Sequence, residues 1–348
     1  MAKQRYDLAL LIGSSIRTIR RVQHFIRKQV DSDPVDAFSP VRIGTRQKAA
    51  IAIDRDAQRE AKKSFERALH TFNPLVIGEE SPHEPQAPKP DKHSGLVILV
   101  DMIDGTDLLE RGLSNWCSAV VMYTKRDGIL ASFVGIPEDG VYFATYADRH
   151  AFKYRNNSEP IAVHKPTGAT RMPKWGGLSF DVDALDLDDA RARLLSVRVP
   201  QSMPSDKQKS LEQASVCVNT QKRGHVEALA EVGPRVLNWL RQSGKAADQF
   251  RFYDLSGNPM LARLAEGRVD VVLTLKGSAP HDFVPGAFIA RRAGASIMTL
   301  TRGARTLDLN RAVWRPATQY VAARTLTLAS EIRQLLPDTS QLPPETID

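Results

Sequence analysis

The first 70 residues carry apolar and polar side chains in a pattern typical of α-helices. Between residues 7 and 30, arginines fall on one side of a helical projection and apolar side chains on the other. These apolar positions are Leu8, Leu11, Ile12, Ile16, Ile19, Val22 and Ile26. The spacing predicts a long amphipathic helix. Prolines and a glycine then predict a loop over residues 31–50, followed by a second helix from Asp54 to about His70 with acidic residues in its first turn.

Shorter apolar runs follow, and turn residues separate them. In the first half these runs predict strands at 96–100, 116–123, 129–135, 141–146 and 151–154, joined as an antiparallel meander. The second half, from about residue 175, combines predicted strands at 178–181, 215–219, 251–255 and 269–275 with predicted helices at 226–242, 259–266, 285–293 and 326–336. Helices that alternate with sheets, without an internal repeat, predict a layered α/β architecture.

One apolar strand runs into a group of acidic residues. The segment from residue 98 to residue 108 carries Asp101, Asp104 and Asp107 around Gly105, which permits a sharp turn, and the hydroxyl of Thr106. Carboxylate oxygens that converge on one point are ligands for hard cations such as Mg²⁺. A metal site that handles phosphate is the leading interpretation, although Asp and Gly also form ordinary turns at strand ends.

Further carboxylates stand at the ends of other predicted elements. Glu79 and Glu80 follow the apolar run 75–78, and Asp282 comes just before the predicted helix 285–293. Asp54 begins the second helix, where it either looks into a site or caps the helix. Acidic residues at several separate ends suit a site assembled from several elements.

The order of these residues resembles that of the inositol monophosphatase superfamily, whose members are Mg²⁺-dependent, lithium-sensitive phosphomonoesterases. The family pattern is an upstream Asp, then Glu-Glu, Asp-Pro-Ile-Asp-Gly-Thr, and finally Trp-Asp with Gly-Gly further on. The matching residues are Asp54, Glu79-Glu80, Asp101 to Thr106, His281-Asp282 and Gly294-Ala295. Met102, His281 and Ala295 replace the proline, the tryptophan and the second glycine, and none of these changes removes a carboxylate.

The resemblance implies a fold, a cofactor and a set of ligands. The expected fold is a layered α-β-α-β-α sandwich of the sugar-phosphatase type. Residues 1–338 would form one phosphatase domain of two α/β halves, about 1–170 and 171–338, with a tail at 339–348. The expected cofactor is Mg²⁺. The first ion is expected at Glu79, Asp101 and the carbonyl of Ile103, and the second at Asp101, Asp104 and Asp282.

The resemblance also implies roles in catalysis and in substrate binding. Glu79, Thr106 and Asp54 are expected to be catalytic, with Thr106 bonded to Asp54 and orienting the attacking water. The backbone amides of Gly105 and Thr106 are expected to receive phosphate oxygens. Glu80 is expected to be a structural or outer acid rather than a ligand.

Other candidate residues are expected to contact the part of the substrate beyond its phosphate. The residues that lie where family members contact substrate hydroxyls are Ser256, Gly257 and Asn258. Asp107 either meets the substrate or faces water. Lys276 and Arg223 are candidate anion contacts, and Lys276 stands near the position of the family glutamate that contacts inositol. Substrates with a second phosphate or another added negative charge are therefore expected to be preferred over inositol monophosphate. His281 either stacks on the substrate or packs beside the metals.

Composition narrows the class of protein. The chain has 348 residues, enough to bury a substantial core, and its net charge of +8 favours anionic ligands. Its basic residues are spread along the chain without an aromatic-interleaved motif, so nucleic acid is not a favoured partner. Cys117 and Cys217 form no CxxC pair, which indicates buried thiols and a reducing cytoplasm. The apolar run 8–12 is too short for a signal sequence or a membrane span.

The sequence therefore predicts a cytoplasmic, Mg²⁺-dependent phosphomonoesterase that hydrolyses a small phosphorylated sugar or polyol, of the inositol-phosphate or fructose-bisphosphate type, by two-metal activation of water. The first alternative is a 3′(2′),5′-bisphosphate nucleotidase, which the positive charge suits. The second is a non-catalytic phosphometabolite-binding protein, because His281 and the segment before Asp54 depart from the family pattern. The expected partners are a phosphorylated small molecule and, by resemblance, a second copy in a homodimer, with no membrane.

Overall fold

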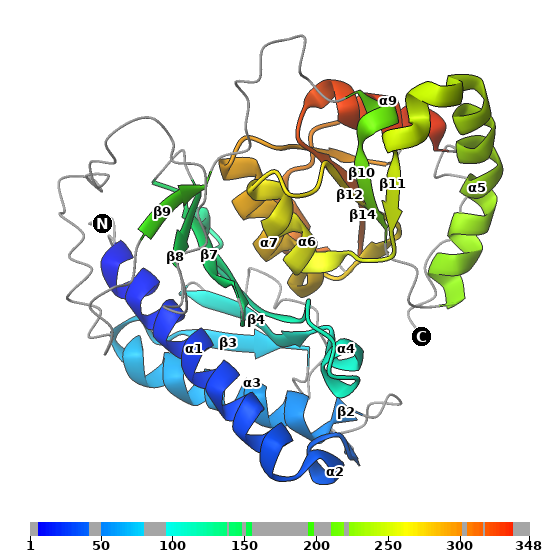
Figure 1. The fold of residues 1–348 in the computed structure, drawn as a ribbon. Coiled ribbons are helices and arrows are strands. Elements are labelled where there is room, and N and C mark those ends of the chain that lie inside the picture. Colours follow the sequence, from blue (N-terminus) through cyan, green and yellow to red (C-terminus); the bar gives the residue numbers. More distant parts are fainter. Residues whose placement is uncertain are drawn as a thin grey trace.

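The computed structural model describes residues 6–41, 50–79, 95–137, 139–147, 151–154, 194–197, 210–218, 223–300, 305–315 and 317–336. Helices and sheets in these ranges stack in five layers, in the order helix, sheet, helix, sheet, helix (Figure 1). The α/β class and its layered arrangement are thereby confirmed. No helix in the described ranges is both long enough and apolar enough to cross a membrane.

The larger sheet has seven strands in the order β3-β4-β5-β6-β7-β8-β9. Their bounds are β3 (Leu75–Gly78), β4 (Val97–Asp104), β5 (Cys117–Thr124), β6 (Gly128–Ile136), β7 (Gly140–Thr145), β8 (Ala151–Tyr154) and β9 (Leu194–Val197). β3 and β4 are parallel, and β5 to β8 form the predicted antiparallel meander. Nearly every residue of β4 to β8 is buried, because helices cover both faces of the sheet. This burial explains why the strands read as continuous apolar runs.

The outer face of this sheet is covered by α1 (Leu8–Ser32) and α3 (Ala52–Ala68), close to the two predicted helices. Asp7 caps α1 by accepting a hydrogen bond from the amide of Leu10 at 3.2 Å. The hydroxyls of Thr18 and Ser64 lie 2.7 Å apart and join the two helices. Short elements complete this part of the molecule: α2 (Pro34–Ala37), β1 (Pro40–Val41), β2 (Ala50–Ile51) and η1 (His70–Phe72).

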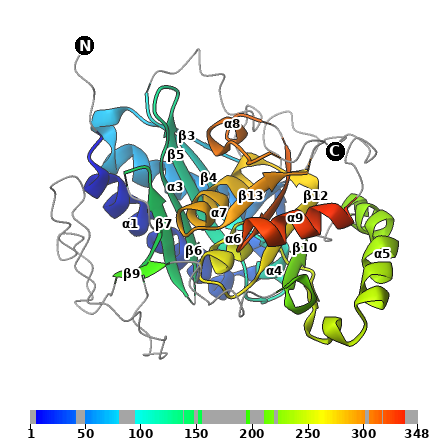
Figure 2. The same ribbon diagram turned by 90° about the horizontal axis from the view of Figure 1, so that it is seen from above.

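The middle layer consists of α6 (Gly257–Ala265) and α7 (Pro280–Arg292), which pack between the two sheets. The second sheet has five strands in the order β11-β10-β12-β14-β13. Their bounds are β10 (Ser215–Val218), β11 (Arg251–Tyr253), β12 (Val271–Ser278), β13 (Ser296–Thr299) and β14 (Thr318–Ala323). Figure 2 shows α5 (Arg223–Ser243) and α9 (Leu326–Leu335) on the side of this sheet away from α1. The remaining elements are α4 (Thr106–Glu110), α8 (Leu309–Ala312), η5 (Leu211–Gln213) and η6 (Gly244–Gln249).

The start of α7 differs from the prediction. The helix begins at Pro280, a residue suited to a first turn, so Asp282 lies inside that turn and not before the helix. Pro285 has no N–H to offer the carbonyl of His281 four residues earlier. The side-chain amide of Asn258 donates to that carbonyl instead, at 2.7 Å. A residue from α6 thus completes the first turn of α7.

The bounds of other helices and strands also differ from the prediction. β4 continues beyond the predicted strand as far as Asp104, because its residues stay buried against β5. Ile51 is the N-cap of α3 and Asp54 lies within its first turn, so the capping alternative for Asp54 was wrong. β9, β13 and β14 were not predicted, and alanines in β14 carry a weak strand signal. The predicted strand 178–181 lies outside the described residues, and the division into halves near residue 170 stays a prediction.

Candidate functional site

The carboxylates of Asp101 and Asp104 stand on either side of an irregularity in β4. Asp101 pairs with Ala119 of β5 and Asp104 with Cys117, so β4 has one more residue than β5 between these pairs. Such a bulge bends a strand and redirects its side chains. The carboxylate of Asp101 accepts a hydrogen bond from the amide of Ile103 at 3.1 Å, which fixes the carboxylate against its own backbone.

Gly105 ends β4 and begins α4. Its φ of 102° lies in the left-handed region that glycine adopts without strain. The turn directs the hydroxyl of Thr106 towards two oxygens, Oδ1 of Asp54 at 2.9 Å and the carbonyl of Ile103 at 3.0 Å. The Asp54 and Thr106 pair expected from the family resemblance is therefore formed, and it joins α3 to the end of β4. Asp107 lies exposed in the first turn of α4.

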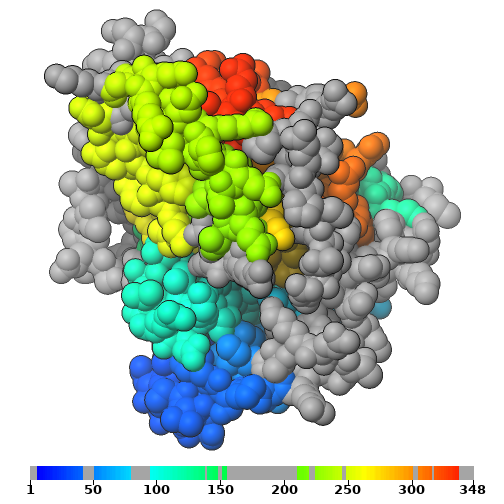
Figure 3. Space-filling view, turned by 90° about the vertical axis from the view of Figure 1, so that its right-hand side faces the viewer, coloured from blue at the N-terminus to red at the C-terminus, as the bar shows by residue number. Residues whose placement is uncertain are grey.

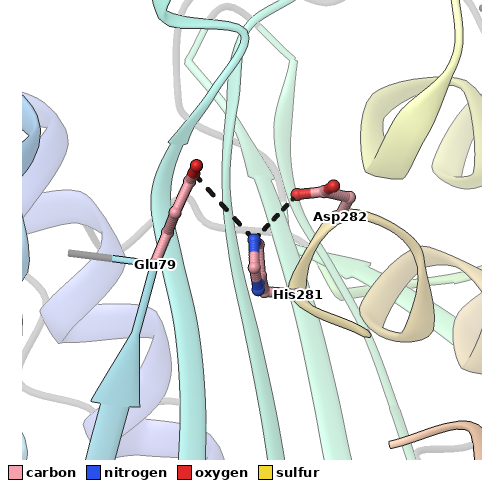
Figure 4. Close-up of side chains that lie close together, drawn as sticks. All are labelled: Glu79, His281 and Asp282. Atoms are coloured by element: carbon pink, nitrogen blue, oxygen red, sulfur yellow. Dashed lines mark ion pairs between the residues drawn. The ribbon is translucent and has the colours of Figure 1, made fainter. Parts of the chain in front are cut away.

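Glu79, at the end of β3, and two residues of α7 form a second group of possible ligands (Figure 4). One ligand atom from each of Glu79, His281 and Asp282 lies within 4.8 Å of the other two. His281 Nε2 is 3.1 Å from Asp282 Oδ1 and 3.9 Å from Glu79 Oε2. The imidazole is buried, whereas both carboxylates are partly exposed, so this corner of the site is open to solvent.

Asn258 holds the site together from α6. Its backbone N–H and its side-chain amide both donate to Oδ2 of Asp104, at 3.1 and 3.0 Å. The same amide donates to the carbonyl of His281, and its own oxygen accepts from the amide of Gly286 at 2.9 Å. Asn258 is fully buried, so its expected contact with substrate hydroxyls was wrong. It positions Asp104 and α7 instead.

Crowding and burial make the carboxylates resist ionisation. Burial, followed by the charges of Asp104, Glu79, Asp282 and Asp54, raises the pKa of Asp101 well above its ordinary value. Burial and Asp282 also raise the pKa of Asp104 to about 8, although the hydrogen bonds from Asn258 oppose the shift. The dependence on four neighbouring carboxylates shows that elements far apart in the sequence direct negative charge at one region. Bound cations would remove this repulsion, so the residues fit the oxygen-rich sites that divalent cations occupy.

Cys117 and Tyr320 border this region, which no local pattern around either residue predicts. The thiol of Cys117 lies 3.9 Å from Oδ2 of Asp104. Burial, with the charges of Asp104 and Asp101, raises the pKa of this thiol, which therefore remains neutral and is a poor nucleophile. Burial also raises the pKa of Tyr320, and Asp104 adds to the shift.

Three of the predicted substrate residues, Ser256, Gly257 and Lys276, lie on or next to elements of the second half of the chain. Gly257 has a φ of 77°, and a Cβ added there would lie 3.1 Å from Oδ2 of Asp104, so the glycine allows α6 to approach the carboxylate. Ser256 precedes it and is half-buried. The ammonium of Lys276 lies against Gly224 in the first turn of α5. Figure 3 shows that α4 lies between the first elements and α5 on this face. Glu80 and the side chain of Arg223 lie outside what the structure describes.

Comparison with known proteins places this geometry in a family. A profile of the inositol monophosphatase family matches residues 11–334. Among curated proteins, no sequence match was found. Three similar solved structures illustrate the shared fold. An inositol monophosphatase II from Staphylococcus aureus superposes with a TM-score of 0.60 at 18% identity, over 95% of this chain and 98% of the other.

The other two structures come from different bacteria. An IMPase from Thermotoga maritima has a TM-score of 0.58 at 15% identity, over 94% of this chain and 96% of the other. The extragenic suppressor protein SuhB from Bartonella henselae has a TM-score of 0.57 at 13% identity, over 94% and 97%. At such identities these structures establish the common fold and nothing more specific.

Proposed function

Because the chain belongs to the inositol monophosphatase family, we propose that it is a Mg²⁺-dependent phosphomonoesterase acting on a small phosphorylated sugar or polyol. The observation that carries the proposal is the convergence of carboxylates from β3, β4, α3 and α7, together with the hydroxyl of Thr106 held by Asp54. Without bound cations these carboxylates would repel an anionic substrate. The site therefore has to hold cations before it can bind a phosphate ester.

The carboxylates divide into two groups of ligands. Glu79, Asp101 and the carbonyl of Ile103 would hold one cation, and Asp101, Asp104 and Asp282 the other. Divalent cations bound there would neutralise phosphate charge and make a water molecule more acidic. Asp104 and Asp282 are brought together by α6 and α7, because Asn258 contacts both Asp104 and the first turn of α7.

Thr106 and Asp54 would position the attacking water. Thr106 can donate its one hydroxyl proton to Asp54 at 2.9 Å or to the carbonyl of Ile103 at 3.0 Å, and in either case an oxygen lone pair remains to accept a hydrogen bond from water. Water held in this way directs its own lone pair towards the phosphorus. Glu79 would act as a metal ligand and as the acceptor of the water proton. The amides of Gly105 and Thr106 would bind the phosphate oxygens, and Asp107 would face the substrate.

Specificity depends on the residues of the second half. Ser256 and Gly257 would line the site for substrate hydroxyls, and Lys276 would bind an additional negative group. A charge-assisted hydrogen bond contributes about 1.5–3 kcal/mol, so Lys276→Met should lower kcat/KM for a bisphosphorylated substrate roughly tenfold or more. Inositol monophosphate should be nearly unaffected. Equal losses for both substrates would show that Lys276 does not read the second group.

A nucleotidase is the second candidate. Solved structures of the Staphylococcus aureus protein include one with inositol monophosphate bound and one with 2′-AMP bound. A site of this fold therefore binds a phosphate monoester of either a polyol or a nucleoside. The net charge of +8 of this chain is compatible with a bisphosphorylated nucleotide. A cytoplasmic homodimer also remains part of the proposal, and light scattering of the purified protein measures its mass.

Phosphate release from a panel of substrates tests the function. The panel should contain inositol monophosphate, fructose 1,6-bisphosphate and adenosine 3′,5′-bisphosphate, each assayed in EDTA and after addition of Mg²⁺. We expect no turnover in EDTA, recovery with Mg²⁺, and inhibition by Li⁺ as in the family. Full activity in chelator would contradict the metal mechanism. Saturable binding without turnover of any substrate would favour the non-catalytic alternative.

A further inference from the structure

His281 is the residue at which this site departs most from the family pattern, because an imidazole replaces a tryptophan. Its side chain is 4% exposed, and Nε2 points to the carboxylates of Asp282 and Glu79 (Figure 4). The other ring nitrogen, Nδ1, is buried and has no hydrogen-bond partner among the described residues. Nε2 is thus the ring nitrogen directed at the carboxylates, which are 38% and 42% exposed and leave a path from solvent.

We infer that His281 is a nitrogen ligand of the cation site, and that Glu79, Asp282 and His281 together bind a first-row transition-metal dication more tightly than Mg²⁺. The inference rests on the proposed function, which places cations at these carboxylates, and it assigns Glu79 and Asp282 to one ion with His281 where the two-cation scheme assigns them to different ions. Metal bonds of about 2.0–2.2 Å put neighbouring ligand atoms roughly 3 Å apart and opposite ones roughly 4.3 Å apart. The observed separations of 3.1 and 3.9 Å from Nε2 fall within that range.

The chemistry of the donor atoms determines the preference. Mg²⁺ binds oxygen and retains water, whereas transition-metal dications also bind imidazole nitrogen. A tryptophan at this position would offer no lone pair, since its indole nitrogen only donates. The backbone of His281 is fixed as well, because Asn258 bonds its carbonyl at 2.7 Å where Pro285 leaves it without a helical donor.

Electron paramagnetic resonance of bound Mn²⁺ tests the inference directly. The protein is stripped with chelator, one equivalent of Mn²⁺ is added, and nitrogen couplings are recorded by pulsed methods. We expect a directly bound ¹⁴N in the wild type. Protein made with ¹⁵N-labelled histidine should show the ¹⁵N coupling instead, and this measurement requires no mutation. His281→Gln should remove the coupling, while His24→Gln, at an exposed histidine of α1, should retain it.

Competition between metals gives the second measurement. We expect Mn²⁺ to bind more tightly than Mg²⁺, and His281→Gln to weaken Mn²⁺ binding about tenfold or more while Mg²⁺ binding changes little. Mn²⁺ binding and Mg²⁺-dependent phosphate release without any histidine coupling would overturn the inference and leave the proposed function intact. Absence of both metal binding and metal-dependent hydrolysis would overturn the proposed function and the inference together.

Discussion

Asp101 and Asp104 are held in positions that disfavour the ionised forms of their own carboxyl groups. Both are held close to other carboxylates, and burial raises the pKa of each. In the protein without cations, part of the cluster therefore remains protonated near neutral pH. The arrangement is tolerated because β4, α6 and α7 fix the positions of these side chains through hydrogen bonds from Ile103 and Asn258.

Asp101→Asn should separate activity from stability. The neutral amide cannot replace a carboxylate that holds cations, and loss of a preorganised electrostatic group typically costs about 10²–10³-fold in turnover. The chelated variant should be at least as stable as the wild type, because one source of repulsion is gone. Steady-state kinetics at saturating Mg²⁺ and urea unfolding in EDTA provide the two readouts. The exposed Glu231→Gln of α5 is the matched charge control, and turnover of Asp101→Asn close to that of this control would exclude Asp101 as a ligand.

The stability of the chelated protein should depend on pH through Asp104. Its pKa is about 8 in the folded protein against 3.8 as the ordinary value, so between these values the folded state binds a proton that the unfolded state has lost. The free energy of unfolding should therefore fall as pH rises through this window. Urea unfolding in EDTA across the window measures the slope. Asp104→Asn should flatten it, and an equally steep slope in that variant would assign the effect to another group.

At the scale of elements, the contact between α6 and α7 decides whether the site forms. Pro285 interrupts the hydrogen bonding of α7 near His281, and the side chain of Asn258 fills the gap on both sides, at the carbonyl of His281 and the amide of Gly286. The same side chain reaches Asp104 on β4. One residue of α6 thus sets the relative positions of the two elements that carry Asp104 and Asp282.

Asn258→Ala should affect both folding and catalysis. It leaves the His281 carbonyl and the Gly286 amide without their partner, and each buried unsatisfied group costs about 1–3 kcal/mol. We expect a lower melting temperature and, because Asp104 and Asp282 lose their common support, lower turnover with a higher Mg²⁺ requirement. Asn238→Ala, on the exposed face of α5, should change neither. Unchanged metal dependence in Asn258→Ala would show that Asn258 serves the fold alone.

At the scale of the whole molecule, an ion cluster around the buried Lys153 joins the seven-stranded sheet to the middle layer. Lys153 on β8 is fully buried and lies 2.6 Å from Asp139, after β6, and 2.8 Å from Glu266, at the end of α6. The hydroxyl of Tyr142 lies within hydrogen-bond distance of the same two carboxylates and can donate its proton to either one, and Arg268 lies 2.8 Å from Glu266. This cluster and the apolar core around α6 and α7 attach the second half to the first sheet.

Lys153→Met should destabilise the protein by about 3–5 kcal/mol, because it removes a fully buried cation from two partly buried carboxylates and leaves them only the half-exposed Arg268 among their cations described above. Arg268→Met, at the exposed rim of the same cluster, should cost about 1 kcal/mol or less. Urea unfolding at neutral pH compares the two variants. Similar small losses would indicate that water reaches the carboxylates of Asp139 and Glu266 and compensates for the lysine.

The same cluster predicts behaviour in acid. Burial by itself would raise the pKa of Asp139, but hydrogen bonds from Lys153 and Tyr142 lower it below its ordinary value. A carboxylate with a depressed folded pKa stabilises the protein above the ordinary carboxyl pKa, and that stability is lost as pH falls through the folded value. Asp139→Asn should therefore lose less stability on acidification than the wild type, and an equal loss would assign the acid sensitivity to other carboxylates.

The sequence by itself determined the elements whose patterns are local. The apolar stripe of α1, the meander from β5 to β8 and the turn at Gly105 each follow from side chains close together in the chain, because helical periodicity, apolar runs and glycine geometry are local properties. The acidic residues at the ends of these elements were also recognisable, and their order resembled a family pattern. From this information the layered fold and the presence of a carboxylate site could be predicted.

Only the tertiary structure decided how those residues meet. Asn258 and Asp104 are 154 residues apart in the chain, and nothing in the local sequence around either residue predicts their hydrogen bonds. The same holds for His281 beside Glu79 and for Lys153 between Asp139 and Glu266. Burial and electrostatic coupling arise when distant segments pack together, so the pKa values and the nitrogen donor beside the carboxylates depend on the packing of α6 and α7 between the two sheets.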